Sequence, residues 1–361
     1  MAELVQITVM MAPLLFVLVM ANMAEKRRIE GRAQKSRKLA RIAFAPLVIF
    51  YVAAFLAGFD IQQGAPVLGR VAEAMHQAGI REQAAFEFGA IDSPGLIGMG
   101  LWLPSLFGLL LLTEPARQGA ARITNLDAEN PLHAGALSLS MLIFINLLAT
   151  VGVGLGNATD LLQAQEALEP TSTGGTIAMI WLQQIAFALT ALVGVGWLTR
   201  RTLGEALERL GLVVPTRRQV LLGVGWAFLL IPMIGLIGAV STFFGVGANP
   251  DVERLTEQML GPLFQSPLGI LTLGASAALG EETVFRGALQ PPFGLVVTAL
   301  LFALLHSNYG ISASTAIVFL LGLVLGRLRL RHNTTTAMVT HATYNMILGL
   351  LTYISLSLME L

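Results

Sequence analysis

The sequence has no cysteine and very few charged residues. Without cysteine, the chain can form neither disulfides nor cysteine-ligated metal centres. Charged residues make up 12% of the 361 residues, apolar residues make up 55%, and the mean hydropathy is +0.72. A soluble domain carries about 25% charged residues, so a chain of this length and composition belongs in a bilayer. The net charge is zero, so nothing indicates a nucleic-acid partner.

The sequence also lacks the short motifs of common soluble hydrolases and nucleotide-binding proteins. No H-E-x-x-H, no G-x-S-x-G and no Walker-type loop occurs. The residues that follow the five histidines are Gln77, Ala134, Ser307, Asn333 and Ala342. The soluble zincin and serine-hydrolase templates are therefore absent.

Long apolar segments are what the sequence has in abundance. About ten of them run along the chain, at roughly 4–23, 42–59, 94–113, 134–156, 177–198, 221–245, 268–289, 292–307, 311–328 and 335–359. Most reach the ~20 residues that cross the hydrocarbon core, and the eighth and ninth are shorter. Because lipid cannot satisfy a bare backbone, all should be helical or packed within helices. The sequence therefore predicts an all-α polytopic membrane protein with about 8–10 transmembrane helices.

Lys and Arg are distributed unevenly between the loops. Four loops, at about 25–41, 114–133, 199–219 and 327–331, hold 18 of the 22 Lys and Arg residues. If every segment spans, these loops lie on one side, which the positive-inside rule makes cytoplasmic. The localisation that we expect is a prokaryotic inner (cytoplasmic) membrane.

Ionisable residues inside the apolar segments are concentrated in the second half of the chain. We expect residues 1–200 to be an accessory transmembrane region of about five helices, whose function the sequence does not assign. We expect residues 201–361 to be a catalytic helical bundle that encloses a polar cavity. Intramembrane ionisable groups are costly to bury, so each of them is a candidate for function.

The first cluster of such groups is the stretch "EETVFR", with Glu281, Glu282 and Arg286. In a helix Glu282 and Arg286 are four residues apart on one face, so they can pair. Glu281 is rotated by about 100° from Glu282 and is not neutralised by that pair. A desolvated carboxylate without a full partner suits a general base. Alternatively, the three residues form an ion-pair staple near the cytoplasmic interface, with Arg286 snorkelling, although a staple does not explain Glu281.

Two further clusters are "FALLH", which ends at His306, and "HATYN", which holds His341 and Asn345. His306 is alternatively an ordinary interfacial residue, and His341 and Asn345 alternatively bond neighbouring helices together. Together with Glu281, these side chains could activate a water and stabilise an oxyanion. They could also bind a divalent metal through Glu281, His306 and His341. The stretch "GLVLG" at 322–326 predicts close helix packing through small residues.

The order E-E-x-x-x-R, F-x-x-x-H, H-x-x-x-N resembles the CPBP intramembrane protease family, also called the CAAX protease and bacteriocin-processing or Abi family. The resemblance covers roughly residues 203–355 and all three motifs. It implies an intramembrane endopeptidase that hydrolyses a peptide bond with a glutamate-activated water.

The resemblance also implies roles for single residues. Glu281 corresponds to the general base, Glu282 to a supporting acid, and His306 to a histidine that orients the water. His341 and Asn345 correspond to a pair that stabilises the oxyanion, and Arg286 and Phe302 are structural supports. The cofactor stays open, because Zn²⁺ and a metal-free glutamate mechanism are both compatible with the family pattern.

The expected partners are membrane lipid and a peptide or protein substrate, which can itself be anchored in the membrane. Two alternatives come from other classes: a non-catalytic membrane immunity or scaffold protein, and an ion- or proton-coupled transporter. Transporters often show repeats and broken helices in both halves. This chain has its ionisable groups in one half, which disfavours the transporter.

Overall fold

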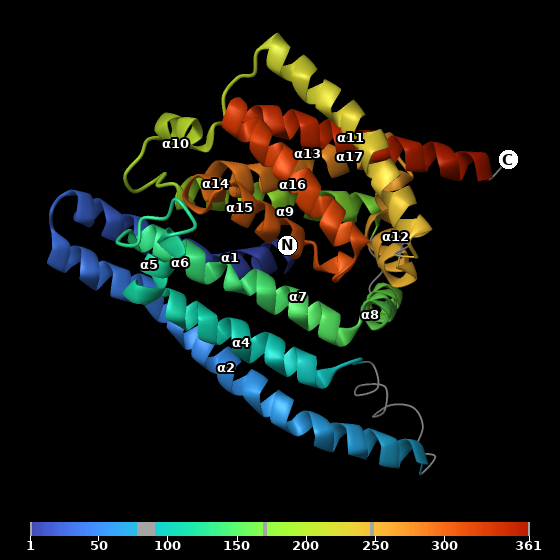
Figure 1. Cartoon of the computed structure of the whole chain (residues 1–361), viewed down its shortest axis with the longest axis horizontal. Helices are drawn as coiled ribbons and strands as arrows, with labels where there is room; N and C mark the ends of the chain where they lie inside the picture. The colour runs from blue at the N-terminus through green and yellow to red at the C-terminus, as the bar shows by residue number, and fades with distance from the viewer. Residues whose placement is uncertain (1, 78–90, 169–171, 246–248, 360–361) are drawn as a thin grey trace.

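The computed structural model describes residues 2–77, 91–168, 172–245 and 249–359, and Figure 1 shows their arrangement. All regular elements in these ranges are helices, and no strand occurs among them. The predicted all-α fold is therefore confirmed.

The N-terminal part is a layer of long helices. α1 (Ala2–Ile29) and α2 (Ala33–Gln77) form a hairpin, and α4 (Pro94–Leu111) packs along α2. The close approach of α2 and α4 depends on Gly58 and Gly98, because a Cβ on either glycine would collide with the backbone of the other helix. The elements that follow are α5 (Glu114–Ala121), α6 (Pro131–Leu139), α7 (Met141–Val153), α8 (Leu155–Leu168) and α9 (Thr173–Gly194).

The C-terminal part is a bundle in which α13 (Pro267–Glu282) packs between α9 and α17 (Thr334–Met359). α11 (Arg217–Phe243) covers α17, and α15 (Leu295–Leu305) packs against α16 (Ala313–Arg331). The remaining elements are α10 (Leu203–Leu210), α12 (Pro250–Phe264), the π-helix η1 (Thr283–Leu289), α14 (Gln290–Phe293) and the 3₁₀ turn η2 (Ser307–Tyr309).

Seven stretches of the described residues are long and apolar enough to cross a membrane, which makes this an integral membrane protein. They are Ala33–Val67, Pro94–Leu111, Pro131–Val153, Thr173–Gly194, Arg217–Phe243, Pro267–Phe293 and Ala313–Arg331. The segment predicted at 292–307 contains α15, whose 11 residues are too few to span alone. The segments predicted at 4–23 and 335–359 lie within α1 and α17, of 28 and 26 residues.

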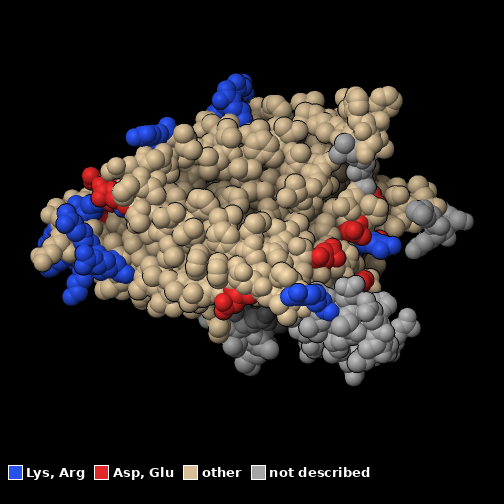
Figure 2. Space-filling model, turned by 60° about the horizontal axis from the view of Figure 1, so that its bottom comes forward, with Lys and Arg blue, Asp and Glu red and all other residues tan. Residues whose placement is uncertain are grey.

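The four loops rich in Lys and Arg meet at one end of the molecule, on the left of Figure 1, and we call it the basic end. Arg28 bonds to Asp127, and Lys26 to the carbonyl of Thr199, so the first loop contacts the second and third. The third loop contacts the start of α17, which follows the fourth loop, through Val213 and Thr335. Figure 2 shows basic side chains gathered at its left end, and an uncharged centre of this face. The four loops rich in Lys and Arg therefore lie at the same end of the structure, as predicted.

The two halves of the chain share hydrophobic cores. Leu126 and Leu137 of the first half cluster with Phe285, Phe293 and Phe302 of the second. A second cluster joins the end of α9 to α10 in the same way. The division at residue 200 stays a prediction about function, and it does not separate two independent cores.

Candidate functional site

The acidic motif lies where helix α13 widens into the π-helix η1, deep in the bundle. The sequence predicts regular α-helix through residue 289, and here the structure differs. The hydroxyl of Thr283 donates to the carbonyl of Leu279 at 2.6 Å. A side chain that competes for the i−4 carbonyl in this way perturbs the helical ladder, and π-turns are frequent at functional sites.

Glu282 and Arg286 form the predicted ion pair, with 3.1 Å between Oε1 and Nη1. Both side chains are fully buried, at 0% and 1% exposed. The same Oε1 also lies 2.8 Å from Nδ1 of His341, on α17. Because a carboxylate only accepts, His341 donates from Nδ1. Glu282 therefore joins the first motif to the third.

Arg286 is held by the protein and does not snorkel to the interface, as the staple alternative required. Its guanidinium lies 4.1 Å above the ring of Phe302 and donates from Nη2 to the carbonyl of Gly322. Phe302 is 1% exposed, and it also makes edge contacts with Phe285, His306 and His341. This ring is thus the packing centre of the cluster, consistent with the supporting part predicted for it.

Glu281 forms no ion pair with Arg286 in the described part of the chain, as the helical rotation predicts, and it faces His306. Oε2 of Glu281 lies 4.0 Å from Nε2 of His306, and the two side chains are 13% and 25% exposed. This Oε2 is buried and has no hydrogen-bond partner among the described residues. Nδ1 of His306 donates to the carbonyl of Phe302 at 2.8 Å, because a carbonyl can only accept.

The structure places the two members of the third motif differently. His341 is 3% exposed and is turned towards Glu282. Asn345 lies one turn further along α17 and is half-buried, and no hydrogen bond of the described residues involves its side chain. The predicted pairing of His341 with Asn345 on one face is compatible with this geometry, and their role as oxyanion donors stays a prediction.

The three residues considered for a metal do not converge. No group of three His, Asp or Glu side chains in the described ranges is arranged to hold a metal ion. Glu281 and His306 face each other, whereas His341 uses Nδ1 on Glu282. The set Glu281, His306 and His341 therefore does not fit Zn²⁺ in this conformation, and no step below is assigned to a metal.

The structure adds residues that the sequence patterns missed. Ser307, next to His306, bonds to Asn146 at 2.8 Å and to Thr150 at 3.3 Å, both on α7. Tyr309 stacks on the His306 ring at 5.8 Å between centroids. Sequence spacing carries no signal for a contact between α7 and η2, because the partners are 161 and 157 residues apart.

The "GLVLG" stretch packs closely, as predicted. A Cβ on Gly322 would lie 3.2 Å from Cβ of Ala299, and a Cβ on Gly326 would collide with Leu295. Close approach also exposes the two glycine carbonyls, which accept hydrogen bonds from Arg286 and Gln290. The small residues therefore also supply acceptors for buried polar groups of the motif helix.

Fold and site together define a polytopic all-α membrane protein with an acid–imidazole cluster inside its C-terminal bundle. Residues 263–347 match the family model for type II CAAX prenyl endopeptidase Rce1-like proteins. The match contains all three motifs and confirms the resemblance over this segment. At family level it supports a CAAX-type intramembrane protease. Comparisons with curated proteins and with solved structures gave no match.

Proposed function

We propose that this protein is an intramembrane endopeptidase in which Glu281 activates the attacking water. The observation that carries the proposal is the buried Oε2 of Glu281, which has no protein partner and lies 4.0 Å from His306 Nε2. A buried acceptor without a partner is costly. Oε2 of Glu282 is also without a partner, but Glu282 is 0% exposed, whereas Glu281 is 13% exposed and can be reached by water.

The tautomer of His306 indicates what lies between the two groups. In the neutral tautomer that donates from Nδ1 to Phe302, Nε2 has a lone pair and faces a second acceptor, Glu281. Two acceptors require a donor between them. A water that makes two hydrogen bonds of about 2.8 Å at roughly a right angle spans about 4 Å. Such a water is deprotonated by Glu281 as it attacks a carbonyl carbon.

Glu282 is unsuited to that task, and its surroundings explain why. It is 0% exposed, and its Oε1 faces Arg286 and His341. Its charge is therefore compensated, and substrate water has no access to it. We assign Glu282 and Arg286 to support, and Glu281 to chemistry.

His341 and Asn345 are the proposed donors to the carbonyl oxygen as it becomes an oxyanion. Nδ1–H of His341 donates to Glu282, so Nε2 is the nitrogen left for substrate. Nε2 donates only when the ring holds both protons. The half-buried Asn345 would add an uncharged N–H donor.

The depth of the site suits a membrane-anchored peptide. His341 comes seven residues after the start of α17 at the basic end, which is about 10 Å along the helix axis. The matching family is named for a type II CAAX prenyl endopeptidase. We propose the same substrate class here: a peptide with a lipidated C-terminal CAAX sequence, which enters near the cytoplasmic leaflet.

The test is cleavage by the full-length protein in lipid nanodiscs, with farnesylated CAAX peptides, followed by mass spectrometry in ¹⁸O-water. Glu281→Gln should lower the rate by a factor of about 10²–10⁴, because it removes the general base while keeping the side-chain size. Glu208→Gln, an exposed acid on α10, is the matched control and should cleave like the wild type. ¹⁸O should appear in the new carboxyl group.

If the folded Glu281→Gln protein cleaves at the wild-type rate, Glu281 is not the general base. If the wild type cleaves no peptide and leaves no ¹⁸O in any product, the proposal of a peptidase is wrong, and the scaffold or transporter alternative is favoured.

A further inference from the structure

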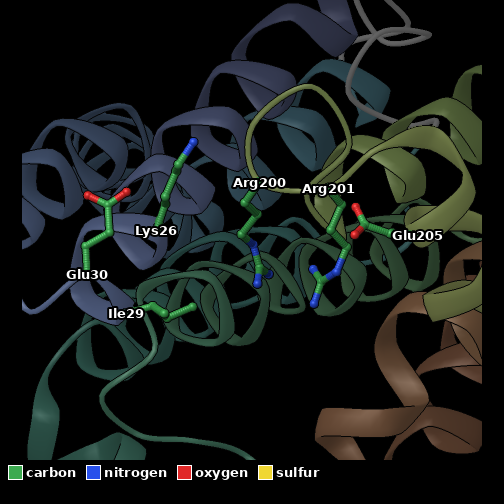
Figure 3. A pocket seen from close by; sticks show the side chains of 6 residues that line it. All are labelled: Lys26, Ile29, Glu30, Arg200, Arg201 and Glu205. Carbon is green, nitrogen blue, oxygen red and sulfur yellow. The ribbon is translucent and has the colours of Figure 1, made fainter.

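A second polar site lies outside the motif cluster, in a pocket at the basic end (Figure 3). The pocket has a volume of about 450 Å³ and opens where α1 ends and the α9–α10 connection begins. Its lining residues are Lys26, Ile29, Glu30, Arg200, Arg201 and Glu205. None of them belongs to the three motifs or to residues 263–347.

The cations of this pocket have no acidic partner. Among the described residues no carboxylate lies within 4.0 Å of Lys26, Arg200 or Arg201. The two acids in the lining are engaged elsewhere: Glu30 pairs with Arg27 and Arg32, and Glu205 caps α10 through Thr202.

The backbone turn before Arg200 brings the two arginines together. Gly196 has φ +112°, which favours glycine, and a Cβ there would lie 2.8–3.2 Å from the Arg200 and Arg201 side chains. Figure 3 shows both guanidinium groups pointing the same way, whereas the ammonium group of Lys26, on the neighbouring helix, points the other way. Nε of Arg200 is fixed by the buried Asn22 at 2.8 Å.

Like charges and burial make this arrangement unfavourable without an anion. Desolvation, followed by the neighbouring Arg201, lowers the pKa of Arg200 to about 10. Arg209 adds positive charge nearby and also lacks a carboxylate within 4.0 Å in the described part of the chain. The paired N–H groups of an arginine guanidinium match the oxygens of a phosphate group in geometry and charge. A phosphate is therefore the anion best suited to balance Arg200 and Arg201.

We propose that this pocket binds the phosphate of an anionic phospholipid headgroup. The pocket lies at the level where α1 and the candidate span α9 end, which is where headgroups meet a membrane protein. Ile29 in its wall is 66% exposed, and Leu198 beside the arginines is 69% exposed. These apolar side chains would contact the glycerol and upper acyl chain, which a free phosphate lacks. Basic pockets on the cytoplasmic side suit such headgroups.

The test measures binding of dihexanoyl phosphatidylglycerol to the full-length protein in detergent, by native mass spectrometry over a lipid titration. The variant Arg200→Gln/Arg201→Gln should weaken binding about thirtyfold, and Lys26→Gln about fivefold. The control Arg217→Gln/Arg218→Gln removes two exposed arginines from the same end, outside the pocket, and should leave the Kd unchanged. Lys26 is exposed, so its variant keeps the test valid if the double variant misfolds.

An unchanged Kd in Lys26→Gln or in a folded Arg200→Gln/Arg201→Gln protein overturns the proposal, as does an equal loss in the control. Two competitors identify the ligand. Displacement by inorganic phosphate at the lipid's own concentration would overturn the lipid assignment, and displacement only at far higher concentration supports it. Equal affinity for dihexanoyl phosphatidylcholine would overturn the preference for an anionic headgroup.

Discussion

Replacing Glu282 by alanine should strongly destabilise the protein. The substitution removes the carboxylate that lies 3.1 Å from Arg286 and 2.8 Å from His341, both nearly inaccessible to water. Arg286 would keep only the carbonyl of Gly322 and the face of Phe302. Breaking a buried ion pair on one side costs about 3–5 kcal/mol, because the remaining charge stays buried without compensation.

The assay is thermal unfolding in nanodiscs, followed by the fluorescence of the four tryptophans. Glu208→Ala, which truncates an exposed acid, should unfold like the wild type. The double variant Glu282→Ala/Arg286→Met should recover much of the lost stability. It removes the buried unpaired charge of Arg286 and places an apolar methionine side chain against the ring of Phe302. The reasoning is refuted if Glu282→Ala lies within about 1 kcal/mol of the wild type, or if the double variant is less stable than the single one.

Three further outcomes follow from the same contacts. Glu281→Gln should be as stable as the wild type or more stable, because the Oε2 that it replaces has no protein partner; a lower Tm would contradict this. Asn146→Ala should slow cleavage about tenfold at unchanged Tm, because it removes the 2.8 Å hydrogen bond to Ser307 beside His306; an unchanged rate would show that Asn146 does not position this histidine. Cleavage should persist in a metal chelator, because the acid and imidazole groups do not converge on one point; loss of activity that zinc restores would reverse this view.

Sequence reasoning succeeded where the interaction is local. The pairing of Glu282 with Arg286 and the separate direction of Glu281 follow from helical geometry over five residues. The all-α membrane fold follows from composition and segment length. The basic end follows from the counts of Lys and Arg in the loops.

The sequence could not indicate contacts between distant segments. His341 meets Glu282 across 59 residues, and Ser307 meets Asn146 across 161. Such contacts depend on which helix faces which, and a single sequence does not encode this as a periodicity. The π-helix Thr283–Leu289 was missed because spacing rules assume a regular α-helical ladder.

The two adjacent acids therefore differ because of tertiary partners, and this difference separates stability from catalysis. An ion-pair staple accounts for Glu282 and Arg286 but not for Glu281. The contacts give the two acids different effects on stability: loss of Glu282 leaves Arg286 and His341 without their acceptor, whereas loss of Glu281 removes a buried oxygen that has no protein partner. A carboxylate kept at such a cost is expected where chemistry needs it. Since Glu282 also accepts the hydrogen bond from Nδ1 of His341, the residue that stabilises the bundle is the one that fixes the ring of the proposed oxyanion donor.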